Sequence, residues 1–67
     1  KLGEYDKSIS DYSKSIELDP DEPDAYYNRG NCYRELGEYE EAISDYTKVI
    51  DLDSKYTKAY LNRALLL

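Results

Sequence analysis

The stretch LGEYEEAISDY at residues 36–46 nearly repeats the stretch LGEYDKSISDY at residues 2–12. When the chain is aligned with itself so that Leu36 meets Leu2, 33 pairs align and 16 of them are identical. The repeat period is therefore 34 residues. A period of this length is typical of repeat arrays, in which neighbouring units bury a shared core that one unit cannot bury alone. The sequence therefore predicts an ordered array despite its polar composition.

The apolar residues of the second unit are spaced as on one face of a helix. They recur at steps of three and one, and they are Tyr39, Ala42, Ile43, Tyr46, Val49 and Ile50. This spacing predicts an amphipathic α-helix. It places Tyr39 at a packing position and places the acidic side chains, Asp45 among them, largely off the apolar face.

A second helix is expected before this one, over about residues 24–36. Gly30 on it and Ala42 on the following helix are small, which suits a close crossing of two helices. Gly37 follows directly and suits a left-handed C-terminal stop. In the repeat alignment, Lys1 and Leu2 correspond to Glu35 and Leu36, so we expect them to lie at the end of a helix as well. A last helix is expected to begin at about residue 57. The predicted fold class is therefore all-α, without strands.

The composition excludes several kinds of function. The chain has 67 residues and a net charge of −6, and an acidic surface repels the phosphates of nucleic acids. Its longest apolar run, Ala64 to Leu67, is far short of the ~20 residues that span a membrane. With no His and a single Cys, the usual zinc sites and His-based catalysis are excluded. We therefore expect no metal, no cofactor, no enzymatic activity, no nucleic-acid partner and no membrane partner.

The sequence also bears on where the protein is located. No Met opens the chain, which indicates a piece of a longer protein, and no signal peptide is recognisable. A single unpaired Cys32 favours a reducing compartment, so we expect a cytoplasmic protein. We interpret Cys32 as a small buried filler, because no neighbour in the sequence would lower the pKa of its thiol.

A helix-turn-helix unit of about 34 residues with these landmarks resembles the tetratricopeptide repeat. The residues that carry the resemblance are Pro20, Tyr26, Gly30, Tyr33, Leu36, Gly37, Tyr39, Ala42 and Tyr46. It implies antiparallel helix pairs, called A and B, stacked as a right-handed superhelical α-solenoid. Residues 1–22 would hold helix B of a preceding repeat, residues 23–56 a complete repeat and residues 57–67 helix A of a following one. Arg29 and Arg63 stand where the family usually has Leu.

In this family the stacked A helices line a concave groove that holds peptide segments of partner proteins. The resemblance implies that the groove residues here are Tyr27, Asn28, Asn31, Lys58, Leu61 and Asn62. An Asn amide offers a donor and an acceptor, so it can bracket a peptide backbone. Because Asn is also a poor helix former, three of them indicate a task other than helix formation. We expect Asn31 to be exposed, so that its removal costs little stability.

One subclass of the family grips the two carboxylates at the C-terminus of a chaperone. Asn31 and Asn62 match the asparagines of its first two repeats, but Tyr27 stands where a Lys is required. In the other register Asn28 and Lys58 match, and Asn62 takes the place of an Arg. Neither register is complete.

The function that the sequence favours is a non-enzymatic protein–protein interaction module with a groove for a partner peptide. Two alternatives remain open. The chain could be a structural spacer or self-assembling unit with an idle groove, or a repeat appended to a catalytic domain outside this chain. The two ends are predicted to bare complementary apolar faces, so we also expect head-to-tail self-association.

Overall fold

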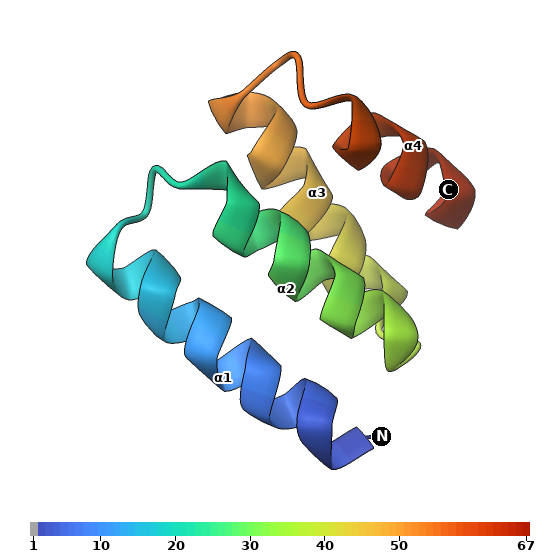
Figure 1. Ribbon diagram of the computed structural model, residues 1–67. Coiled ribbons are helices and arrows are strands. Elements are labelled where there is room, and N and C mark those ends of the chain that lie inside the picture. The colour runs from blue at the N-terminus through green and yellow to red at the C-terminus, as the bar shows by residue number, and fades with distance from the viewer. Residues whose placement is uncertain (1) are drawn as a thin grey trace.

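The structure is a computed structural model that describes residues 2–67, with side chains from residue 3, and this part of the chain is helical with short turns. The helices are α1 (Leu2–Leu18), α2 (Pro23–Glu35), α3 (Tyr39–Leu52) and α4 (Thr57–Leu66). Successive helices run antiparallel, with α2 against both α1 and α3, and α4 against α3 (Figure 1). The predicted all-α fold is confirmed. The right-handed superhelix stays a prediction, and Lys1, with which the first predicted segment begins, lies outside the described residues.

The turn between α2 and α3 closes as the sequence predicts. Gly37 has a φ of 80°, in the left-handed region that a side chain disfavours. Its N–H donates to the carbonyl of Arg34 at 3.0 Å, and the N–H of Glu38 donates to the carbonyl of Tyr33 at 2.9 Å. These two bonds satisfy carbonyls that the end of a helix leaves free. The predicted stop at Gly37 is therefore confirmed.

The same four residues, LGEY, behave differently at positions 2–5. Repeat symmetry predicts a turn at Gly3, but α1 already begins at Leu2, and Gly3 has no positive φ. At Gly37 the left-handed turn is held by hydrogen bonds to the helix before it. Within the described residues, the helix runs through Gly3 without such a turn. The predicted helix end at Leu2 is wrong.

The core lies between α2, α3 and α4. Its fully buried side chains are Ala42, Tyr46, Val49 and Ala59, and Tyr26 closes it with 8% exposure. A Cβ on Gly30 would lie 2.9 Å from Cε1 of Tyr46, closer than real Cβ contacts. The predicted close crossing at Gly30 therefore exists. Its nearest neighbours, however, are the Tyr46 ring and the Cβ of Asp45, rather than Ala42.

Two side chains of α3 lie on different faces from those predicted. Tyr39 is 53% exposed, because it is the first residue of α3 and its ring lies at the end of the helix pair, where little chain surrounds it. Asp45 is only 4% exposed, although a carboxylate normally stays in water. Its burial depends on a cation from the facing helix.

Candidate functional site

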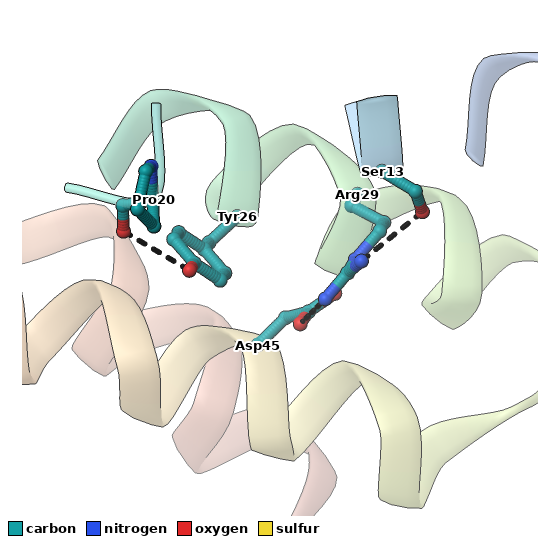
Figure 2. A network of polar contacts seen from close by, with 5 residues as sticks. All are labelled: Ser13, Pro20, Tyr26, Arg29 and Asp45. Atoms are coloured by element: carbon teal, nitrogen blue, oxygen red, sulfur yellow. Dashed lines mark hydrogen bonds and ion pairs between the residues drawn. The ribbon is translucent and has the colours of Figure 1, made fainter. Parts of the chain in front are cut away.

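The cation that accompanies Asp45 is Arg29 of α2 (Figure 2). Nε of Arg29 donates to Oδ2 of Asp45 at 2.8 Å, and Nη2 donates to Oδ1 at 2.7 Å. This is a bidentate pair, the strongest geometry for a guanidinium and a carboxylate. The remaining Nη1 donates to Oγ of Ser13 on α1 at 3.1 Å. One side chain of α2 thus ties together the helices on both sides of it.

Aromatic rings complete the surroundings of Arg29. Its guanidinium carbon lies 5.8 Å from the ring centroids of both Tyr26 and Tyr33, within the range of cation–π attraction. The Tyr26 hydroxyl donates to the carbonyl of Pro20 at 3.0 Å, which anchors the ring beside the loop (Figure 2). The hydrogen bonds to Asp45 raise the pKa of Arg29 above its ordinary value, against the opposing effect of burial. Each of its three nitrogens donates a hydrogen bond within the fold, so we do not assign it to a binding site.

The sequence analysis missed this pair, although a signal for it existed. The repeat places Arg63 at the position of Arg29, and Asp11 at the position of Asp45. An Arg at a usually apolar position, together with a carboxylate recurring at the same place in the facing helix, indicates a buried pair. A helical-periodicity argument treats both residues as polar surface and therefore separates them.

A second polar cluster lies on the face that α2 shares with α4. Nδ2 of Asn62 donates to the hydroxyl oxygen of Tyr27 at 3.0 Å and to Oδ1 of Asn31 at 3.2 Å. The hydroxyl of Tyr46, from the core, donates to the same Oδ1 at 2.5 Å. Three of the six predicted groove residues are thus joined to one another, and the cluster connects three helices.

We call this group the amide cluster, and its members are Tyr27, Asn31, Asn62 and the Tyr46 hydroxyl. It changes the interpretation of the asparagines. Asn31 is half-buried and hydrogen-bonded, so the expectation of a freely exposed amide is wrong. Burial raises the pKa of the Tyr46 hydroxyl, which keeps it protonated as the donor to Asn31. Two of the three asparagines therefore have a structural task in addition to any role in binding.

The amide cluster nevertheless leaves polar atoms for a ligand. Nδ2 of Asn31 and Oδ1 of Asn62 make no hydrogen bond within the described residues. In the same part of the chain, no fully buried side-chain nitrogen or oxygen lacks a partner, so neither of these two atoms is fully buried. The cluster therefore presents one donor and one acceptor on amides whose orientation is already fixed.

The other predicted groove residues flank the cluster without joining it. Lys58 is exposed, Leu61 is 61% exposed and Asn28 is half-buried, and none of the three forms a hydrogen bond or ion pair within residues 2–67. Tyr27 is less available than predicted, because its ring packs with the centroid 5.1 Å from that of Tyr56. Leu61 is therefore the main apolar side chain that this surface offers to a partner.

A further bond closes one end of the same surface. The hydroxyl of Tyr56, just before α4, donates to Oδ1 of Asp24 at 2.7 Å. Burial, followed by this bond to a carboxylate, raises the pKa of Tyr56. Because Tyr56 directly precedes α4 and Asp24 lies in the first turn of α2, the bond fixes α4 to the start of α2. The two helices of the candidate surface are therefore held together at two places.

Other kinds of site find no support in the described residues. They contain no group of three His, Cys, Asp or Glu side chains that could hold a metal ion, and they enclose no pocket. None of their helices is both long and apolar enough to cross a membrane. Cys32 is half-buried rather than buried, and burial, with a smaller contribution from Glu35, raises the pKa of its thiol. The thiol is therefore a weak nucleophile at neutral pH.

Two family models match the chain. A model described as the tetratricopeptide repeat matches residues 23–56, which is just over half of the sequence. A second model, described as a TPR repeat, matches residues 1–33. No curated protein matches the chain.

Proposed function

The chain belongs to the tetratricopeptide repeat family, and we propose that it holds an extended segment of a partner protein across α2 and α4. Repeats of this family are generally protein–protein interaction modules and are typically not catalytic. The observation that carries the proposal is the amide cluster, which joins the two helices and still leaves one donor and one acceptor without a bond in the described residues.

The free atoms of the cluster suit a peptide backbone. Oδ1 of Asn62 would accept a hydrogen bond from a backbone N–H, and Nδ2 of Asn31 would donate one to a backbone carbonyl. Both amides are already held by other bonds, so binding costs them little side-chain entropy. A surface without an enclosed pocket also fits an extended chain better than a small molecule, which usually needs a concave site.

The flanking residues define which side chains the segment would carry. Leu61 offers exposed apolar area, so we propose that the segment places an apolar side chain against it. Lys58 has no partner of its own within the described residues and would meet an acceptor of the segment. The net charge of −6 attracts basic stretches over longer range, although salt screens this beyond about 8–10 Å.

Selection of a displayed random-peptide library on the whole chain, followed by calorimetric titration of the selected peptides, tests this proposal. Leu61→Ala and Lys58→Ala should each weaken binding, the former by about tenfold, or about 1.4 kcal/mol. The matched controls on α1 are Leu18→Ala and Lys14→Ala, whose side chains are comparably exposed. If the controls weaken binding as much, or if no peptide is selected, the proposal fails.

The three other interpretations make different predictions in the same experiment. A carboxylate clamp would lose its ligand when the peptide C-terminus is amidated, and we expect no such loss, because Tyr27 fills the place of a Lys. A spacer with an idle groove would select no peptide. A repeat appended to a catalytic domain differs only in the rest of the protein. The cytoplasmic location remains a proposal that rests on the unpaired thiol of Cys32.

A further inference from the structure

The bond from Tyr46 fixes which way both amides of the amide cluster are turned. The Tyr46 hydroxyl lies 2.5 Å from its acceptor on Asn31, a distance usual between two oxygens but too short for a nitrogen and an oxygen. The atom of Asn31 that meets Tyr46 is therefore Oδ1. Asn62 must then turn its Nδ2 toward Asn31, because its own oxygen would face another acceptor there. A core residue of α3 thus sets the polarity of both amides.

The bonds inside the cluster use only part of its hydrogen-bonding capacity. Oδ1 of Asn31 accepts from Tyr46 and from Asn62, and Nδ2 of Asn62 donates to Asn31 and to the Tyr27 oxygen. An amide nitrogen carries two hydrogens, and an amide oxygen carries two lone pairs. Within the described residues, Nδ2 of Asn31 therefore keeps both hydrogens, Oδ1 of Asn62 keeps both lone pairs, and the Tyr27 hydroxyl keeps its own hydrogen.

A neighbouring repeat would not take up this capacity. In the alignment of the chain with itself, Asn62 corresponds to Asn28, and Asn31 corresponds to Leu65. The bond from Asn62 to Asn31 therefore runs from one unit to the unit before it. A further unit in the same register would direct its equivalent bond at Leu65, so Oδ1 of Asn62 would stay open.

We propose that the amide cluster binds the side-chain carboxamide of an Asn or Gln in the partner segment, an inference that rests on the function proposed above. The backbone of the segment would use one hydrogen of Asn31 and one lone pair of Asn62. Two donors, on Asn31 and Tyr27, and one acceptor, on Asn62, are then left. A carboxamide is complementary to this set, because its oxygen accepts two hydrogen bonds and its nitrogen donates.

Other polar side chains match the remaining atoms less well. A carboxylate would accept from Asn31 and Tyr27 but would set an oxygen against Oδ1 of Asn62, in a chain whose net charge is −6. An ammonium group offers no acceptor to the two donors. A hydroxyl makes all its bonds through one atom, whereas the donors here belong to α2 and the acceptor belongs to α4. A carboxamide distributes its acceptor and its donor over two atoms in the same way.

Peptides selected on the whole chain test the proposal through their own sequence. They should carry Gln or Asn at a fixed spacing from the apolar residue that meets Leu61. Replacement of that Gln by Glu, Met or Thr should each weaken binding by about tenfold in calorimetric titration, because each leaves part of the cluster unpaired. Met keeps the length of the side chain and removes only its polar atoms. The matched control places the same Met elsewhere in the peptide and should bind like the parent.

A variant of the chain identifies the partner of the carboxamide. Tyr27→Phe removes one donor, so it should weaken the Gln peptide severalfold and leave the Met peptide unchanged. Tyr39→Phe is the control, because it removes a hydroxyl that lies outside the amide cluster. It should leave the affinity of both peptides unchanged. Circular dichroism confirms that each variant folds.

The possible failures distinguish this inference from the proposed function. If no peptide is selected, both fail. If peptides bind and depend on Leu61 but keep their affinity with Met or Thr in place of Gln, only the carboxamide is refuted. Equal or tighter binding of the Glu peptide also overturns it, and would assign the contact to Lys58, one turn before Asn62 on α4. An equal effect of Tyr27→Phe on the Gln and Met peptides overturns it as well.

Discussion

The two faces of α2 differ in how the polar side chains that lie between helices are hydrogen-bonded. Toward α3, Arg29 and Asp45 form a bidentate pair beside the close crossing at Gly30. Toward α4, Asn31 is held by one bond from Tyr46 and one from Asn62, and its Nδ2 has no bond within the described residues. The first face can only stabilise the fold. The second stabilises it and keeps bonding capacity for a partner.

The largest expected effect comes from the crossing at Gly30. Gly30→Leu forces a large side chain into the ring of Tyr46, which is fully buried and cannot move away. We expect the free energy of unfolding to fall by at least about 3 kcal/mol, the upper end for overpacking, as measured by urea titration. Gly3→Ala is the control, because a Cβ there meets no atom within 4 Å. It should leave the free energy of unfolding unchanged or raise it by less than about 0.5 kcal/mol, because Gly3 lies in the first turn of α1. Equal damage from both variants would show that α2 and α3 do not cross at Gly30.

Loss of the Arg29–Asp45 ion pair is expected to have the second-largest effect on stability. Asp45→Ala leaves the Arg29 guanidinium half-buried without its carboxylate, and we expect a loss of about 2–3 kcal/mol, slightly below the usual range because the Arg29 side chain keeps 20% exposure. Asp11→Ala removes the equivalent carboxylate from α1, where it has no partner within the described residues, and should change stability by less than about 0.5 kcal/mol. Both are compared by urea denaturation at the same protein concentration. Similar losses would mean that the Arg29–Asp45 pair contributes nothing specific.

Features that depend on local sequence could be predicted, whereas features that depend on a contact between helices could not. Helices, their order and the stop at Gly37 follow from local patterns, namely apolar spacing and a residue that tolerates positive φ. The burial of Asp45 does not, because it depends on Arg29 of another helix, which periodicity counts as polar surface. The helix end expected at Leu2 fails as well, because the same four letters, LGEY, form a turn before α3 and part of a helix at positions 2–5.

For the candidate site, the sequence predicts which side chains share a face but not how they bond to one another. Family resemblance singled out Tyr27, Asn31 and Asn62, and the structure brings these three together. That they bond to one another depends on the distance between α2 and α4, which no local pattern specifies. It also depends on the Tyr46 hydroxyl, which reaches the face from α3. The asparagines were therefore assigned to a ligand alone, when part of their bonding serves the fold.

The smallest effect tests that second face directly. Asn31→Ala removes the acceptor of the Tyr46 hydroxyl and one partner of Asn62, and we expect a loss of about 1 kcal/mol. Asn28→Ala, on the same helix, removes an amide without a bond in the described residues. Both changes gain a similar few tenths of a kcal/mol in helix propensity, so the difference between them isolates the bonds of the cluster. Tyr46→Phe in each background completes the comparison. Its cost should shrink in the Asn31→Ala chain and stay unchanged in the Asn28→Ala chain. If Asn31→Ala and Asn28→Ala have the same urea midpoint, the cluster contributes nothing to stability, and both asparagines are then available to a partner alone.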